Sequence, residues 1–445
     1  MTTVLIVGAG PAGLAAADAA LRAGAEVTLL DGSPQPGGQF HRMPSTATNA
    51  GGRTAFDRQR RRVLAHPRCT WWPESFVWAI EEGPLVHVVR GPVDGVGRAR
   101  YVLAPDALVL ATGAHDRVLP FPGWQLPGVF TAGAAQAFAK GERVAIGRRV
   151  VVSGTGPFLF PVTASLLGVG SRVLGVFEAN AASTALRGWA NRPWEIAGKA
   201  GELLGYATGL ARHRVPYRMG RAVIAAHGGD RVEEVVVARL RADWSVIAGS
   251  ERTIAVDAVC VGHGFSPQLE LAVAAGCELT PAGFVAVGAG QRTSVPGVYA
   301  AGEITSIAGA PAAAAEGAVA GWYAVGPAGP SAALREVTRG QAFARRLARA
   351  HPIGAGWVGW LEPDTIVCRC EETTYATLLA ATADPSMMDD RALRLATRAG
   401  LGPCQGRMCG PTIAELTSSP PTHRRPIAQP IRLGELAEPP VSKED

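Results

Sequence analysis

Residues 3–13, Thr-Val-Leu-Ile-Val-Gly-Ala-Gly-Pro-Ala-Gly, decide the fold of this 445-residue chain. Residues 3–7 form an unbroken run of apolar and β-branched side chains, as expected of a parallel strand buried on both faces. A glycine loop of the pattern G-x-G-x-x-G follows at once, and Pro11 suits the first turn of a helix. A second strand is expected at 26–30, ending at Asp31. Strand, glycine loop, helix and strand at this spacing predict a dinucleotide-binding βαβ unit.

Each small residue of this loop has a physical role. Gly8 permits the tight turn, Gly10 lets a pyrophosphate approach the backbone, and Gly13 lets the helix pack close to the sheet. The helix N-terminus offers unpaired N–H groups and a positive dipole end to the phosphates. The residues expected to contact the dinucleotide are Gly8, Gly10, Pro11, Ala12, Gly13 and, on the ribose hydroxyls, Asp31. The alternative is a tightly packed glycine-rich turn without a ligand.

The segments around this unit favour FAD over NAD. Pro36-Gly37-Gly38-Gln39 follows where flavoproteins commonly run backbone along the cofactor. Residues 293–303 resemble the second flavin motif of the two-dinucleotide-domain reductases, with Glu303 where many relatives carry the aspartate that contacts the ribityl chain. A helix starting near Pro311 and pointing at the flavin pyrimidine would stabilise the anionic reduced flavin. The further residues expected to bind FAD are Gly38, Gln39, Thr112, Gly113, Gly302 and Glu303.

A second βαβ pattern starts with a strand expected at 149–153. Its loop, Gly154-Thr155-Gly156-Pro157-Phe158-Leu159, keeps the first two glycines and has Leu159 in place of the third. Glu178 ends the next strand, at the position that contacts a ribose. Two interpretations stay open: NAD or an adenine nucleotide held by Gly154, Gly156 and Glu178, or a domain that kept the fold and lost the ligand. The absence of a basic residue directly after Glu178 disfavours NADP.

Four of the seven cysteines are clustered near the C-terminus. They form a C-x-C pair and a C-x4-C pair in a glycine-rich frame: Cys368, Cys370, Cys404 and Cys409. Four such thiolates can hold zinc or a [2Fe–2S] cluster. Zinc knuckles prefer C-x2-C pairs, so the spacing favours the cluster and resembles the bacterioferritin-associated-ferredoxin-like [2Fe–2S] fold. The isolated cysteines, predicted to be small core residues, are Cys69, Cys260 and Cys277.

Composition excludes several classes of protein. Hydrophobic residues make up 47% and charged residues 18% of the chain, which is typical of a globular protein. No aromatic-interleaved basic motif is evident, so nucleic acid is not an expected partner. No run of eighteen apolar residues predicts a membrane span. The N-terminus reads as a strand and not as a signal peptide, and cysteines without such a signal indicate a reducing compartment. We expect a cytoplasmic protein, with association with the inner face of a membrane left open.

The predicted fold class is α/β, with two dinucleotide-binding (Rossmann-like) domains of the FAD/NAD-linked reductase type and a small C-terminal [2Fe–2S] domain of the bacterioferritin-associated-ferredoxin type. The repeated strand–loop–helix pattern suggests that the second nucleotide domain is inserted into the first. The expected boundaries are 1–117 (first segment of the FAD-binding domain), 118–256 (inserted NAD-like domain), 257–330 (second segment of the FAD-binding domain), 331–362 (connector), 363–417 ([2Fe–2S]-binding domain) and 418–445 (proline-rich extended tail).

With these motifs in place, the chain resembles the FAD/[2Fe–2S] α subunit of heteromeric amine and amino-acid dehydrogenases. That family includes opine oxidase, hydrogen cyanide synthase and D-hydroxyproline dehydrogenase, with heterotetrameric sarcosine oxidase as a more distant relative. The resemblance covers nearly the whole chain and rests on the glycine loops, on residues 111–136 and on the Cys404-Gln405-Gly406 turn. His115 and His263 stand where relatives often have tyrosine, which argues against either being catalytic.

The resemblance implies an electron-transfer subunit. A partner β subunit with its own flavin would oxidise the amine, and electrons would pass through FAD and the cluster to a quinone or another acceptor. An FMN between subunits and a small third subunit stay open. No acid–base pair, nucleophile set or C-x-x-C motif is evident, so no catalytic residue is expected. The alternatives are a self-contained NADH-dependent FAD/[2Fe–2S] reductase and a non-catalytic scaffold subunit with a structural metal site.

Overall fold

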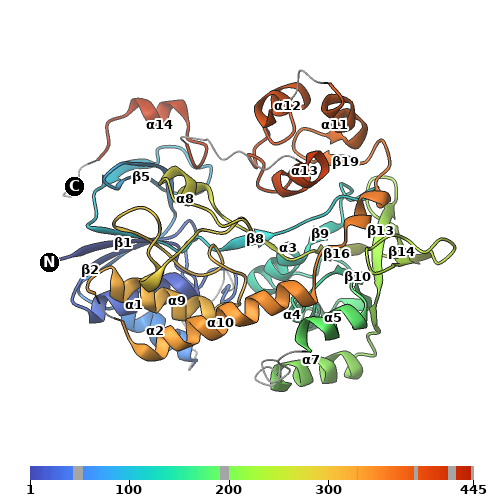
Figure 1. The fold of residues 1–445 in the computed structure, drawn as a ribbon, viewed down its shortest axis with the longest axis horizontal. Helices are drawn as coiled ribbons and strands as arrows, with labels where there is room; N and C mark the ends of the chain where they lie inside the picture. Colours follow the sequence, from blue (N-terminus) through green and yellow to red (C-terminus); the bar gives the residue numbers. More distant parts are fainter. Residues whose placement is uncertain (44–53, 191–199, 328, 385–388, 419–426, 442–445) are drawn as a thin grey trace. The chain divides into compact units, whose positions relative to one another are not determined.

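The computed structural model describes residues 1–43, 54–190, 200–327, 329–384, 389–418 and 427–441. The chain divides into two compact units (Figure 1). Unit 1 consists of Met1–Ala114, Pro267–Ala344 and His423–Asp445, and unit 2 of His115–Ser266 and Arg345–Thr422. The chain leaves unit 1 in β8 (Ala114–Asp116) and returns in β17 (Phe265–Pro267).

Unit 1 is built on a five-stranded parallel sheet in the order β18-β7-β1-β2-β3. Its strands are β1 (Thr3–Val7), β2 (Glu26–Leu30), β3 (Cys69–Trp72), β7 (Ala107–Leu110) and β18 (Val298–Ala300). The strands predicted at 3–7 and 26–30 are confirmed to the residue. The segments that precede Thr112 and Gly302 also form strands of this sheet, so both stretches of the expected flavin motif end at one sheet edge.

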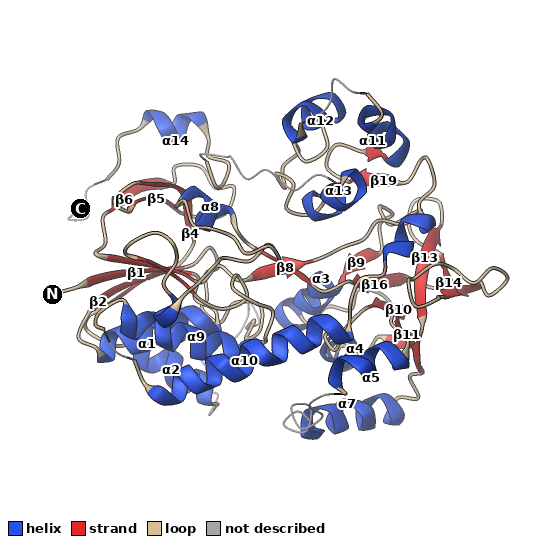
Figure 2. Ribbon diagram, viewed as in Figure 1, coloured by secondary structure: helices blue, strands red, loops and turns tan. Residues whose placement is uncertain are grey.

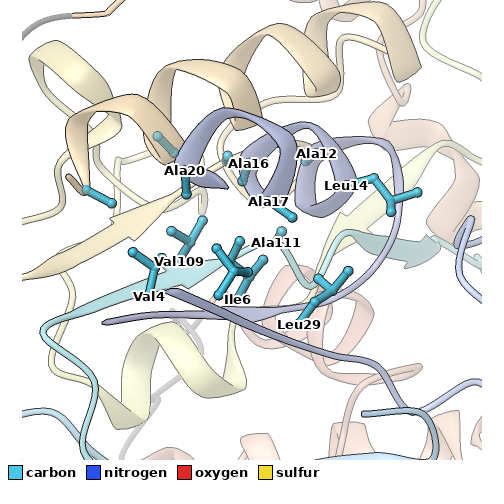
Figure 3. Packing of buried hydrophobic residues seen from close by; sticks show 14 of the residues in the cluster. Val4, Ile6, Ala12, Leu14, Ala16, Ala17, Ala20, Leu29, Val109 and Ala111 are labelled. Carbon is cyan, nitrogen blue, oxygen red and sulfur yellow. The ribbon is translucent and has the colours of Figure 1, made fainter. Parts of the chain in front are cut away.

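Helix α1 (Pro11–Arg22) packs on this sheet and against α9 (Ala310–Tyr323). Figure 3 shows Ala12, Ala16, Ala17 and Ala20 of α1 over the apolar strand residues. The small side chains let α9 come so close that a Cβ on Gly317 would lie 1.9 Å from the carbonyl oxygen of Ala12. The pair of helices thereby fixes the N-terminus of α1 beside the glycine loop.

The rest of unit 1 covers the other side of its core. An antiparallel sheet packs residues into the same cluster as Leu5, Leu30 and Leu108. Its strands are β4 (Ser75–Glu81), β5 (Leu85–Arg90) and β6 (Ala99–Leu103); the remaining helices are α2 (Ala55–Leu64), α8 (Glu270–Ala274), η2 (Ala289–Gln291) and α14 (Leu433–Ala437). The tail was expected to be extended, and α14 is a helix within it. The prolines at 420, 421 and 426 lie outside the described residues.

Unit 2 repeats the parallel architecture in the order β12-β11-β10-β16-β9. Its parallel strands are β9 (Val129–Thr131), β10 (Arg149–Gly154), β11 (Arg172–Glu178), β12 (Tyr217–Met219) and β16 (Ala258–Gly262). An antiparallel sheet consists of β13 (Arg221–His227), β14 (Glu234–Arg239) and β15 (Arg252–Ala255). The helices are α3 (Ala132–Ala137), η1 (Phe138–Glu142), α4 (Leu159–Gly168), α5 (Ala182–Trp189) and α7 (Ala200–Arg212). Figure 2 distinguishes these helices and strands by colour.

The C-terminal stretch of the chain begins with α10 (Ser331–Ala350), which runs from unit 1 into unit 2. The elements that follow are η3 (Ala355–Trp360), β19 (Ile366–Cys368), β20 (Thr373–Thr374), α11 (Tyr375–Thr382), α12 (Asp390–Thr397) and α13 (Gly410–Thr417). These short elements form the cysteine-bearing region of unit 2. None of the helices within the described residues combines the length and apolarity needed to span a membrane.

Candidate cofactor and cluster sites

The first glycine loop lies between β1 and α1 and has no room for side chains at two of its three motif glycines. A Cβ on Gly8 would lie 2.3 Å from the carbonyl oxygen of Ala111, and one on Gly13 would lie 1.7 Å from that of Gly8. Above Gly10, by contrast, the nearest atom to a Cβ is the Cα of Gly38 at 3.9 Å. Gly8 and Gly13 are therefore pressed against backbone atoms, whereas Gly10, the glycine that a pyrophosphate would approach, is less tightly packed.

The start of α1 and the carboxylate of Asp31 complete this loop. No described side chain caps the N-terminus of α1, whose first N–H groups and dipole suit an anion. Asp31 accepts hydrogen bonds from the N–H groups of Ala9 and Ser33, one on each oxygen, both at 2.7 Å. A carboxylate has about four acceptor positions. This half-buried group is thus oriented by the backbone and keeps acceptor positions for ribose hydroxyls.

The other expected FAD contacts flank the loop. Gly37 donates its N–H to the carbonyl of Ala9 at 2.8 Å, which brings the 36–39 segment against the loop. Gln39 is exposed and accepts from Arg42 at 2.7 Å. Beyond β7, the Thr112 hydroxyl donates to the carbonyl of residue 268, whose N–H donates to the Gly113 carbonyl, so this turn is held from both sides.

A buried glutamate that the sequence motifs do not reveal lies beside Gly302 and Glu303. Glu316, on α9, is 1% exposed and accepts from the Gly302 N–H at 2.8 Å and the Thr305 hydroxyl at 2.7 Å on the same oxygen. Its other oxygen has no partner among the described residues. Burial, with the charge of Glu303 nearby, raises the pKa of Glu316 to about 7. Burial also raises the pKa of Glu303. The only sequence signal was one acidic residue in an Ala/Gly-rich helix.

The second glycine loop also follows a parallel strand, but its backbone conformation differs at the second glycine, where φ is −73° in Gly10 and +92° in Gly156. Gly154 approaches Gly262 so closely that a Cβ would lie 1.7 Å from its carbonyl oxygen. Helix α4 begins at Leu159, three residues after Gly156, whereas α1 begins directly after Gly10. Leu159 is buried in the core under β10, in place of the third glycine. The helix N-terminus is therefore set back from the position that a phosphate would occupy.

Glu178, the expected ribose ligand of this second loop, is completely buried. One of its oxygens accepts from the Thr155 hydroxyl at 2.8 Å and the other from the Gly156 N–H at 2.7 Å. Burial opposes its charge, but His351, Thr155 and the backbone of Asn180 outweigh that effect and hold the pKa of Glu178 below its ordinary value. Asp31 is therefore partly exposed, whereas Glu178 is completely buried.

The four C-terminal cysteines come together from two segments of the chain, one at the end of β19 and the other directly before α13. The Cys409 thiol donates to the sulfur of Cys368 at 3.7 Å. Cys404 lies beside both Cys409 and Cys370, so the four sulfurs form a connected set. Cys368 and Cys409 are buried, Cys404 is half-buried and Cys370 is exposed, which leaves one edge of the set at the surface. The three isolated cysteines lie elsewhere: Cys260 and Cys277 are buried core residues, and Cys69 packs at the core edge.

Hydrogen bonds lower the pKa of two of these thiols. The Cys409 thiol and backbone N–H groups, chiefly that of Met408, lower the pKa of Cys404 to about 4. Cys409, with the Gly400 N–H, lowers the pKa of Cys368 to about 6. Gly402 has no room for a side chain, because a Cβ there would lie 2.3 Å from that of Cys370. Within the described ranges, no group of three or more His, Cys, Asp and Glu side chains is arranged to hold a metal ion.

Comparison with known proteins shows the family. The model of the pyridine nucleotide-disulphide oxidoreductase family matches residues 2–317. An opine oxidase subunit of Rhizobium meliloti is 33% identical, over 98% of this chain and 87% of its own. The HcnB subunit of hydrogen cyanide synthase from Pseudomonas protegens is 31% identical, over 91% of this chain and 89% of its own.

A solved structure shows the same fold. L-proline dehydrogenase from P. horikoshii superposes with a TM-score of 0.66 at 21% identity, over 98% of this chain and 79% of its own. The glycine loops on two parallel sheets agree with this likeness. The chain is an oxidoreductase with a Rossmann-type α/β fold, and it belongs to the pyridine nucleotide-disulphide oxidoreductase family.

Proposed function

We propose that the chain is the FAD- and [2Fe–2S]-containing electron-transfer subunit of a heteromeric amine or amino-acid dehydrogenase. It would receive electrons from a partner subunit that oxidises an opine- or imino-acid-type substrate on its own flavin, and pass them to a quinone or another acceptor. The observation that carries the proposal is the pairing of a flavin-type glycine loop with four clustered cysteines in one chain.

The first loop fits FAD. The glycine at position 10, the uncapped start of α1 and the oriented carboxylate of Asp31 suit the adenosine diphosphate moiety of the cofactor. Bound FAD supplies a ring that takes up two electrons and gives them up singly. The residues that would hold it are Gly8, Gly10, Pro11, Ala12, Gly13, Asp31, Gly38, Gln39, Thr112, Gly113, Gly302 and Glu303. Glu316 would position this site by fixing the Gly302–Thr305 turn.

The cysteine set fits a [2Fe–2S] cluster. Such a cluster shares its four thiolates between two irons, so its ligands surround a group of atoms and need not converge on one ion. N–H groups that reach the sulfurs of Cys368 and Cys404 are the donors that tune such clusters. The exposed edge at Cys370 gives electrons a short path to a partner.

Partner subunits are supported by the relatives, whose names are those of enzyme subunits. They include a subunit of opine oxidase, the HcnB subunit of hydrogen cyanide synthase and, over a shorter match, the alpha subunit of sarcosine oxidase. By analogy with these relatives, we propose that this chain has a flavin-containing partner subunit and that the complex is cytoplasmic. A small third subunit, an interfacial FMN and attachment to the inner face of a membrane belong to the same proposal as open points.

The proposal is tested on the chain purified with its natural partners. Visible and EPR spectra are recorded anaerobically before and after reduction with dithionite, for the wild type, Cys404→Ser and the matched control Cys69→Ser. We expect flavin absorbance in all three proteins. The EPR signal of a reduced [2Fe–2S] cluster should appear in the wild type and in Cys69→Ser and disappear in Cys404→Ser. Of the two substituted cysteines, only Cys404 is one of the four clustered cysteines.

Two outcomes would contradict the proposal. Stoichiometric zinc with no EPR signal would show that the four cysteines form a structural metal site and do not transfer electrons. If the protein binds no flavin in the presence of excess FAD, the first glycine loop is not a flavin site. Amine-dependent reduction of the cluster by the intact complex, absent when the partner is removed, would establish the direction of electron flow.

A further inference from the structure

Glu178, the carboxylate expected to bind a ribose at the second glycine loop, is not accessible to a ligand. Glu178 is 0% exposed, and protein donors take both of its oxygens. The N–H of Asn180 adds a third hydrogen bond at 3.1 Å. In a working Rossmann site the acidic residue after the second strand must face the ribose hydroxyls. At Glu178, the protein itself provides those donors.

Residues 351–361, which follow α10 (orange in Figure 1), supply the cover. Nδ1 of His351 lies 3.6 Å from a carboxylate oxygen of Glu178. A Cβ on Gly156 would lie 4.0 Å from Cγ of the same ring, an ordinary van der Waals distance, so His351 lies beside the second motif glycine as well as beside Glu178. The carbonyl of Pro352 accepts from the side-chain amide of Asn180 at 3.1 Å. Both the ribose and the pyrophosphate positions therefore face this segment.

The covering segment is anchored in the core of unit 2. Gly356 donates its N–H to the carbonyl of Asp243 at 2.6 Å, and Nε1 of Trp360 donates to the carbonyl of Trp244 at 3.0 Å. The Trp244 and Trp360 rings stack with an interplanar angle of 4°. Trp357 is only 2% exposed. Displacing the whole segment would break these hydrogen bonds and expose tryptophan surface.

We propose that residues 351–361 are a built-in occupant of the second dinucleotide site and that His351 determines its specificity by excluding nucleotides. The chain then accepts neither NAD(H) nor an adenine nucleotide at Gly154, Gly156 and Glu178. Its electrons must come from a donor other than a free nicotinamide cofactor, such as a reduced flavin on another polypeptide. This inference concerns the second loop and does not depend on what the first loop binds.

Hydrogen–deuterium exchange on the full chain with FAD added tests the proposal, with NAD⁺, NADH and ATP as separate probes. We expect the amides of 154–159 and 354–361 to exchange at the same rates with and without each probe, and NADH to leave the flavin absorbance unchanged. Slower exchange at 154–159 together with faster exchange at 354–361 would overturn the proposal. Flavin absorbance in the same samples reports separately whether the first loop is loaded, so failure there is recognised as failure of the proposed function.

A pair of histidine variants tests the role of the segment. His351→Ala should raise the exchange rate at Gly156 and at 354–361 by about tenfold, the effect of losing one contact to a buried charged group. His227→Ala, an exposed site on β13 of the same unit, should exchange like the wild type. Equal rates in His351→Ala and wild type would show that His351 does not hold the cover, and would overturn its assignment as the specificity residue.

Discussion

At the scale of single residues, the glycine motifs predicted the positions where backbone must meet backbone, and the structure shows why those residues are glycine. Gly8 and Gly13 are fixed by contacts made within the first βαβ unit and the strand beside it, so local sequence carries the signal. Glu316 and His351 escaped prediction because their contacts come from segments that the motifs do not include. A buried charge in a small-residue helix is only a weak clue to its partners.

The buried carboxyl of Glu316 makes stability depend on pH. Its pKa of about 7 in the folded chain lies above the ordinary 4.5 of a glutamate. The folded state therefore holds an extra proton between these two values, and stability is fully present below 4.5 and falls as the pH rises toward 7. Glu316→Gln removes the ionisation and keeps an acceptor for Gly302. It should stabilise the chain by about 3 kcal/mol at pH ~8 and by much less at pH ~5.

Thermal melts of Glu316→Gln at both pH values, followed by tryptophan fluorescence, check this expectation. The control is Glu82→Gln, an exposed turn position that should stay within about 0.5 kcal/mol of the wild type at either pH. An equal effect of Glu316→Gln at pH ~5 and pH ~8 would mean that the buried carboxyl does not titrate in this window.

At the scale of elements, the strands buried on both faces were the most predictable. Their continuous apolar runs identified β1, β2, β10 and β11, and both glycine loops follow from them. The antiparallel strands β4 to β6 were not predicted, because their side chains mix charged and aromatic residues without a strict alternation. Helix α14 was hidden in a proline-rich tail whose anchoring contacts are long-range.

The α1–α9 contact gives a sharp element-scale prediction. Gly317→Ala places a methyl group 1.9 Å from the carbonyl oxygen of Ala12, so the helices must separate, and we expect a loss of about 3 kcal/mol in the free energy of unfolding. Gly205→Ala is the matched control, because a Cβ there meets no atom within 4 Å on α7. It should stabilise the chain by about 1 kcal/mol through helix propensity. Denaturant unfolding curves of both variants measure these two changes in stability. A Gly317→Ala variant as stable as Gly205→Ala would show that α1 and α9 are not in tight contact.

At the scale of the whole chain, each unit is assembled from distant stretches, and the sequence patterns predicted this assembly only incompletely. The cysteine segment was expected to be a separate domain at 363–417, and in the structure it clusters with 115–266. Nε1 of Trp124 donates to the carbonyl of Ile366 at 2.5 Å, and the Thr412 hydroxyl donates to that of Val118 at 3.1 Å. Periodicity within a segment carries no information on such pairings, so only the structure reveals them.

An ion pair helps to hold the C-terminal segment against unit 1. Glu435 receives two hydrogen bonds from Arg98, at 2.6 and 2.8 Å, and the two side chains are 7% and 11% exposed. Removing Arg98 takes two charge-assisted hydrogen bonds from Glu435, and losing a hydrogen bond to a charged group costs about 1.5–3 kcal/mol. Arg98→Ala should therefore loosen residues 427–441 and speed their cleavage in limited proteolysis by about tenfold or more.

Arg149→Ala is the control for this experiment, because its ion pair with Asp257 is exposed and such pairs contribute about 0–1 kcal/mol. It should leave cleavage of 427–441 at the wild-type rate.

Glu435 should also make release of the C-terminal segment depend on pH. Arg98 holds the pKa of the Glu435 carboxyl below the ordinary 4.5. The stabilisation from the pair is then present above that value and is lost as the pH falls through the lowered pKa, so acid should release the tail in the wild type as Arg98→Ala does at neutral pH. Cleavage that is insensitive to both acid and Arg98→Ala would show that the backbone contacts, such as the N–H of Val441 to the carbonyl of Arg100, hold the tail without the ion pair.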